Sequence, residues 1–110
     1  MKPRYCSRAV VRGSAVFTVD GLIGEGQVLD LTVPGCLIDS PFSPKKGDSL
    51  ELCLDLPELG AMFRVARGVV RWMQGSRFGV EFIEMEQRER FRYNATLGTL
   101  LHEQVVSRAV

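Results

Sequence analysis

The feature that most constrains the fold is an alternation of apolar and polar side chains, which is strictest over residues 50–56. Every second residue there is leucine, and the residues between the leucines are glutamate, cysteine and aspartate. Successive side chains of a β-strand point to opposite faces, so this segment predicts a strand with one buried and one solvated face. Strands of this kind are typical of antiparallel sheets that pack on one side only.

Similar segments fill the first three quarters of the chain. Strands are predicted over residues 9–19, 24–31, 36–39, 50–56, 63–72 and 77–83, with turn residues between them. Short strands at this spacing indicate a sandwich or a small barrel, and closure into a barrel removes the exposed strand edges. The predicted fold is therefore mainly β, with a six-stranded antiparallel barrel. Gly68, inside one of the strands, predicts a bulge.

The last quarter has a helical period, and a C-terminal α-helix is predicted over residues 84–107. Its main apolar stripe contains Phe91, Ala95 and Leu101 or His102. A second apolar face, next to the first, is formed by Tyr93, Leu97 and Leu100. Contact with a barrel needs only one apolar face, so the second face is predicted to be a docking surface for an unidentified protein partner.

The chain has 110 residues, which is the length of one domain. We expect a single domain over 1–110, made of a flexible tail over 1–8, a barrel over 9–83 and the helix. No apolar run approaches the roughly 18 residues that a spanning helix needs, and the start lacks the apolar segment of a signal peptide. Cytoplasmic localisation without membrane insertion is expected.

Composition argues against several classes of function. Fourteen Lys and Arg residues balance thirteen Asp and Glu residues, so no overall charge attracts the chain to nucleic acid, although Arg64, Arg67, Arg71 and Arg77 surround an aromatic residue. The three cysteines have neither metal-site nor disulfide spacing and are expected to be reduced. His102 is the only histidine, which leaves too few parts for a catalytic triad or a metal cluster, so no enzyme activity and no cofactor are expected.

Two local features are candidates for a binding site. Arg4 and Arg8 stand just before the first predicted strand, either as a solvated basic tail or as a pair that closes over an anionic ligand. Asp30 and Thr32 lie on alternate residues before Gly35. They either cap a turn or point to the same side and grip one ligand edge, such as the N1–H and N2–H2 donors of guanine.

Together these features resemble the PilZ family, whose signature is RxxxR before the first strand and (D/N)xSxxG between the second and third. Arg4 and Arg8 match the two arginines, Asp30 matches the acidic position, and Gly35 matches the final glycine. Thr32 stands where the family has serine. The proximity of Arg4 to Met1 leads us to expect a stand-alone receiver with no preceding domain.

The resemblance continues in the later strands, where residues 46–52 are similar to the family's G-D-x-L-x-L entry and residues 77–82 to its R-F-G-V-x-F strand. It implies a barrel that binds cyclic di-GMP on its outer surface through the arginines and the acidic motif, and that passes the signal on by protein contact. Trp72 matches a tryptophan near the ligand in some members, although a core position is an alternative. The second possibility is a PilZ-like adaptor that binds no nucleotide.

Overall fold

The structure is a computed structural model that describes residues 7–109. Its elements are β1 (Ala9–Val19), β2 (Leu22–Leu31), β3 (Gly35–Asp39), β4 (Ser49–Leu56), a short 3-10 helix η2 (Pro57–Leu59), β5 (Ala61–Gln74), β6 (Arg77–Glu84) and α1 (Gln87–Ala109). The predicted strands agree with these bounds to within two residues at each end, and the helix begins three residues later than predicted.

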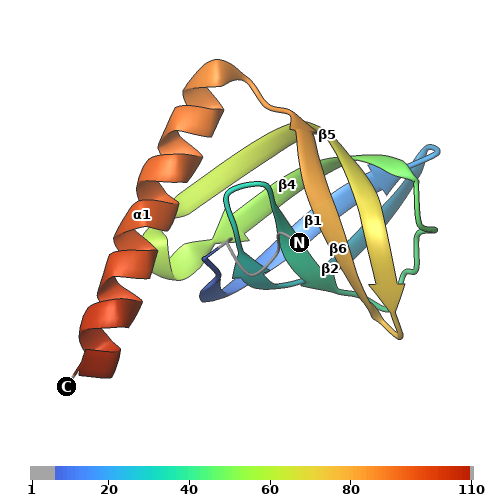
Figure 1. Ribbon diagram of the computed structural model, residues 1–110. Coiled ribbons are helices and arrows are strands. Elements are labelled where there is room, and N and C mark those ends of the chain that lie inside the picture. The colour runs from blue at the N-terminus through green and yellow to red at the C-terminus, as the bar shows by residue number, and fades with distance from the viewer. Residues whose placement is uncertain (1–6, 110) are drawn as a thin grey trace.

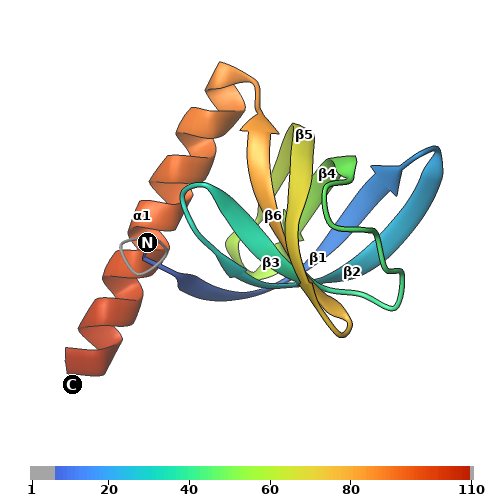
Figure 2. The same ribbon diagram turned by 45° about the vertical axis from the view of Figure 1, so that its right-hand side comes forward.

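The strands close into an antiparallel barrel in the order β1-β2-β3-β6-β5-β4. The helix α1 lies across one end of the barrel, beside the turn between β2 and β3 (Figures 1 and 2). The predicted six-stranded barrel with a C-terminal helix is therefore confirmed. Among the described residues, no helix combines the length and apolarity needed to cross a membrane.

The core fills the barrel with the inward side chains of all six strands. The four leucines of β4 are at most 3% exposed, while Cys53 between them is exposed, as the alternation predicts. Phe17 lies at the centre and meets the rings of Phe42 and Phe78 edge-on, at centroid distances of 5.6 and 5.4 Å. The register of β5 shifts beside Gly68 against both neighbouring strands, which confirms the predicted irregularity.

The prediction for the two faces of the helix is wrong. Tyr93, Leu97 and Leu100 are 0%, 1% and 8% exposed and form the contact with the barrel, whereas Phe91 is 76% exposed. The Tyr93 ring packs edge-on against two aromatic rings at the barrel end, 5.5 Å from Phe63 and 5.3 Å from Phe82. Both faces are apolar, so periodicity alone does not identify which of them meets the barrel.

Candidate ligand site on the barrel surface

A cavity of about 560 Å³ opens on the outer surface of the barrel, next to the turn between β2 and β3. Five of the six predicted site residues line it: Arg8, Asp30, Thr32, Gly35 and Trp72. Arg4 lies outside the described residues. The cavity thus brings residues around the β2–β3 turn together with residues of the β5–β6 hairpin.

A bulge in β2 turns Asp30 away from the core. Val28 pairs with Ile38 while Asp30 pairs with the adjacent Leu37, so β2 carries one extra residue between them. Val28 and Leu31 both face the core, at 1% and 0% exposure. Regular alternation from Val28 would have pointed Asp30 inward. The extra residue points it to the cavity instead, as bulges beside functional sites commonly do.

A second bulge, in β5, does the same for Trp72. Val70 pairs with Val80 and Trp72 with the preceding Gly79, which leaves Arg71 as the extra residue. Val70 is fully buried, and both Arg71 and Trp72 are exposed. Trp72 is 43% exposed, so it is not a core residue. The cause is the bulge, which places the two successive side chains of Arg71 and Trp72 on the outer face.

The indole of Trp72 lies directly on the backbone of Gly79. A Cβ atom added at Gly79 would fall 2.7 Å from Trp72 Cε2 and 2.9 Å from Cδ1, well inside van der Waals contact. Only glycine leaves room for the ring at this position. The indole ring therefore packs against Gly79 of β6, and the same residue, Trp72, lines the cavity.

The turn between β2 and β3 is closed by Thr32 and Gly35. The Thr32 N–H donates to the Gly35 carbonyl oxygen (2.8 Å), the Thr32 hydroxyl donates to the same oxygen (3.1 Å), and the Gly35 N–H donates to the hydroxyl oxygen (3.1 Å). A Cβ atom at Gly35 would collide with the carbonyl oxygen of Val80. The Thr32 hydroxyl thus uses its only proton within the turn, as the turn-capping interpretation expects, and keeps acceptor capacity for a ligand.

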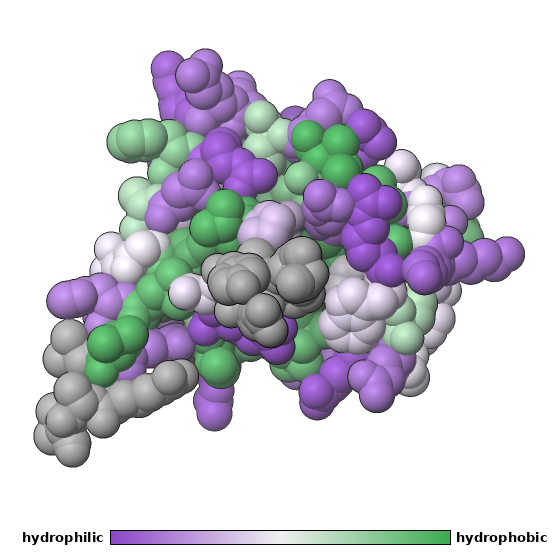
Figure 3. Space-filling view, viewed as in Figure 1, coloured by the Kyte–Doolittle hydropathy of each residue, from purple (hydrophilic) through white to green (hydrophobic). Residues whose placement is uncertain are grey.

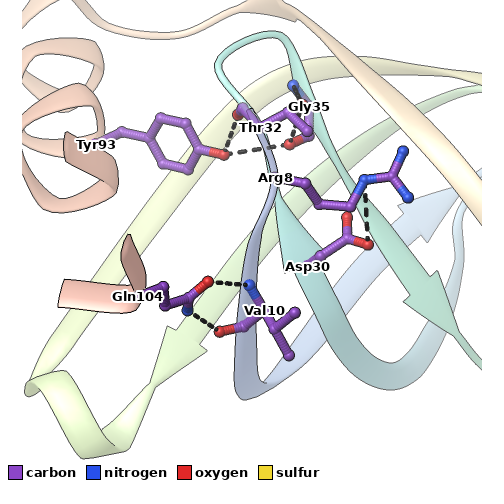
Figure 4. Close-up of polar contacts among 7 residues, drawn as sticks. All are labelled: Arg8, Val10, Asp30, Thr32, Gly35, Tyr93 and Gln104. Carbon is purple, nitrogen blue, oxygen red and sulfur yellow. Dashed lines mark hydrogen bonds and ion pairs between the residues drawn. The ribbon is translucent and has the colours of Figure 1, made fainter. Parts of the chain in front are cut away.

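Asp30 and Arg8 both line the cavity and lie next to each other (Figure 4), with 3.8 Å between Arg8 Nε and Asp30 Oδ2. The Arg8 side chain is 60% exposed and the Asp30 side chain 12%. Burial raises the pKa of Asp30 above its ordinary value, and the positive charge of Arg8 opposes this rise only in part. Because Asp30 is largely buried and its cation partner is 3.8 Å away, an additional N–H donor from a ligand would stabilise its charged form.

Side chains of α1 donate hydrogen bonds to the carbonyl oxygens of the β2–β3 turn, which the sequence did not predict. The Tyr93 hydroxyl lies 2.6 Å from the Thr32 carbonyl oxygen and 3.2 Å from that of Gly35 (Figure 4), and Arg90 Nη1 donates to the Val33 carbonyl oxygen at 2.8 Å. Burial is the main cause that raises the pKa of Tyr93, so this hydroxyl remains a donor. The available signal was a tyrosine on an apolar helix face, whose hydroxyl needs a partner once buried.

The same helix also contacts the segment that follows Arg8. The side-chain amide of Gln104 accepts from the Val10 N–H at 3.2 Å and donates to the Val10 carbonyl oxygen at 2.8 Å (Figure 4). These two bonds replace the sheet pairing that β1 lacks at this point, because β1 pairs with β4 only from Ser14 to Thr18. The turn that follows Asp30 and the segment that follows Arg8 are therefore both hydrogen-bonded to α1.

The surface arginines of the hairpin do not form a basic stripe. Arg67, Arg71 and Arg77 each lie within 4 Å of a carboxylate, namely Glu84 (2.9 Å), Glu81 (2.6 Å) and Asp39 (3.7 Å). Charges matched in this way give little attraction to a nucleic acid backbone. Within residues 7–109 no cluster of His, Cys, Asp and Glu side chains has the geometry of a metal site.

Comparison with protein-family models identifies the relatives of this barrel. The model described as the PilZ domain matches residues 2–101. The chain belongs to the PilZ domain family. The match includes both parts of the motif and the whole of the cavity described above. No curated protein sequence matches the chain.

Solved structures give the same fold. The PilZ domain with c-di-GMP of YcgR from Escherichia coli superposes with a TM-score of 0.75 and 10% identity, covering 98% of each chain. The PilZ domain of CeSA from a cellulose-synthesizing bacterium gives 0.65 and 12%, covering 86% of this chain and 97% of that one. The Inhibitor of motility MotI/DgrA of Bacillus subtilis gives 0.72 and 16% over 96% of this chain, which spans only 52% of that protein.

Proposed function

We propose that this PilZ domain is a cytoplasmic receptor for cyclic di-GMP that transmits the level of the messenger by protein contact, with no catalysis of its own. The observation that carries the proposal is the meeting of Arg8, Asp30 and Trp72 in one cavity, with two bulges turning the last two outward. The structural neighbour from Escherichia coli is a PilZ domain described with c-di-GMP, and this chain has the same fold.

The chemistry of the three side chains fits a guanine nucleotide. The Asp30 carboxylate can accept from the adjacent N1–H and N2–H2 donors of guanine, which would relieve its burial beside a loose partner. The exposed guanidinium of Arg8 can bind a phosphate or, in bidentate fashion, the O6 and N7 atoms of guanine. The indole of Trp72, supported by Gly79, offers a flat surface on which a base can stack.

Thr32 and Gly35 serve this site mainly by shaping the turn. Their mutual hydrogen bonds fix the backbone that follows Asp30, and the Thr32 hydroxyl oxygen keeps a lone pair for a ligand donor. Arg4 is proposed as the second arginine of the tail on the strength of the RxxxR motif alone.

The route by which the signal leaves the domain is proposed to be α1, since this helix is bonded both to the turn and to the start of β1. Its barrel-facing side is not available to a partner, so contact has to use the remaining surface, where Phe91 is 76% exposed. In Figure 3, hydrophilic residues dominate the first turns of α1 and hydrophobic residues lie along its lower part, while the barrel surface is mixed.

An adaptor that binds no nucleotide is the alternative, and titration calorimetry with cyclic di-GMP separates the two. We expect saturable binding that GMP, GTP and cyclic AMP do not reproduce. Arg8→Ala should weaken it by about 1.5–3 kcal/mol, roughly ten- to a hundredfold, if Arg8 makes a charge-assisted contact. Arg12→Ala, a change at an exposed arginine of β1 outside the cavity, is the matched control.

Two outcomes would contradict the proposal in different ways. No heat and no change in melting temperature at saturating ligand would identify the adaptor. Normal binding by Arg8→Ala, within twofold of the unaltered protein, would mean that the tail arginine contributes nothing to the site and that Asp30 and Trp72 hold the ligand without it.

A further inference from the structure

The cavity has a second guanidinium that the motif does not include. Arg71 lines the same cavity as Arg8 but comes from β5, more than sixty residues later in the chain. It is the extra residue of the β5 bulge, so it shares the outer face with Trp72 where regular alternation would have separated them. The strand irregularity that exposes Trp72 thus also brings a positive charge to the cavity.

The orientation of Arg71 suits anion binding. Its Nε donates to Glu81 Oε1 on β6 at 2.6 Å, which fixes the plane of the guanidinium. A guanidinium held by Nε still has the N–H donors of Nη1 and Nη2, and these can bind two oxygens of a phosphate side by side. Glu81 therefore acts as a positioning residue for a group whose remaining donors are available.

We propose that Arg71 is a second anion-binding residue of the site, and that Arg8 and Arg71 together select a ligand with two phosphodiester groups over one with a single phosphate. The inference rests on the proposed function, since it assigns a further contact to the same site. Two guanidinium groups from separate elements, one at the start of β1 and one on β5, match a ligand whose two anionic groups lie on opposite sides of a ring.

A plain cross-strand ion pair is the competing explanation, and the molecule contains a matched example. Arg67 and Glu84 also join β5 to β6, with 2.9 Å between Arg67 Nε and Glu84 Oε1, and both are exposed. This pair does not line the cavity. If substitutions of Arg71 and Arg67 change ligand binding equally, the cause is a general change in the β5–β6 hairpin. If only the Arg71 substitution changes it, the cause is a contact in the site.

The test compares Arg71→Gln with Arg67→Gln by calorimetry against cyclic di-GMP and GMP. We expect Arg71→Gln to weaken cyclic di-GMP binding about ten- to a hundredfold, to leave weak GMP binding within about twofold, and to reduce the salt dependence of the affinity. Arg67→Gln should change each of these by less than twofold. Equal affinities for cyclic di-GMP in the two variants would overturn the assignment.

Glu81→Gln separates a direct contact from a structural one. The amide oxygen can still accept from Arg71 Nε, but the negative charge next to the ligand is removed. If Arg71 binds the anion, this variant should bind cyclic di-GMP about two- to fivefold more tightly. If Arg71 only completes an ion pair with Glu81, Glu81→Gln should weaken binding as Arg71→Gln does, which would refute the inference.

A probe without guanine keeps the inference distinct from the proposed function. Pyrophosphate carries two linked anionic groups, and its titration can be followed by NMR through the side-chain Nε–H signals of the arginines. We expect the Arg71 signal to shift in a saturable way and the Arg67 signal to stay in place. If the protein binds no cyclic di-GMP and the Arg71 signal still shifts, only the proposed function fails. A static Arg71 signal would overturn the second anion site.

Discussion

The support that Gly79 gives to Trp72 can be removed with a single methyl group. In Gly79→Ala the new Cβ would be closest to Trp72 Nε1 and would lie 2.7 Å from Cε2, whereas non-bonded heavy atoms pack at about 3.5–4.0 Å, so the ring has to move by at least about 1 Å. The ring can yield, since Trp72 is 43% exposed. Gly79 has no positive φ, so alanine fits its backbone. The substitution therefore displaces the indole without straining the strand.

The expected consequences for stability and binding differ sharply. Alanine in a strand is favoured over glycine by about 0.5–1 kcal/mol, which offsets the cost of moving the ring, so the free energy of unfolding should stay within about 1 kcal/mol of the unaltered value. Stacking of a base on an aromatic ring contributes about 1–3 kcal/mol. The affinity for cyclic di-GMP should consequently fall by about five- to 150-fold.

Calorimetry and urea unfolding measure the two quantities, and fluorescence reports the ring directly because Trp72 is the only tryptophan. Gly98→Ala, where the new Cβ meets nothing within 4 Å beyond the adjacent residues and backbone of its own helix, is the control and should leave binding unchanged. Gly35→Ala should instead destabilise the fold, because its Cβ meets the Val80 carbonyl oxygen of the backbone. An altered Trp72 emission with unchanged affinity in Gly79→Ala would refute the stacking role.

Two further perturbations address the turn and the acid. Tyr93→Phe removes only the hydroxyl that donates to the Thr32 and Gly35 carbonyl oxygens. We therefore expect the free energy of unfolding to fall by about 1–2 kcal/mol and amide exchange at Thr32 and Gly35 to become faster. Amide exchange as slow as in the unaltered protein would contradict the link from helix to turn. Burial raises the pKa of Asp30 in the fold, so the folded state binds the proton more tightly than the unfolded state, and the stability that this group contributes declines as pH rises from the unfolded to the folded pKa. Ligand affinity should depend on pH in the opposite direction, because the guanine donors need the carboxylate form of Asp30, so the affinity should fall as pH drops through the raised pKa. In calorimetry over the same pH range, Asp30→Asn should bind with an affinity that does not change. Equal pH dependence of the affinity in the two proteins would exclude Asp30 from base recognition.

Local patterning predicted the barrel well. The alternation at β4 and the turn residues between the strands depend on neighbours in the chain, and the period-2 rule converts them into strands with a defined inner face. The order and spacing of Arg4, Arg8, Asp30, Thr32 and Gly35 likewise identify the motif from the chain alone. These features are local, so the amino-acid sequence carries them in full.

The faces of α1 and the second wall of the site were decided by tertiary structure. Helical period does not distinguish the Phe91 face from the Leu97 face, and the choice was made by the rings of Phe63 and Phe82 at the barrel end. The sequence placed Arg71 only in a group of arginines around an aromatic residue, because its place in the cavity depends on a bulge that appears only when β5 pairs with β6. The sequence by itself determined which segments are strands and which residues belong to the motif. Which side chains share one cavity was set by strand register, a property of two segments paired in space.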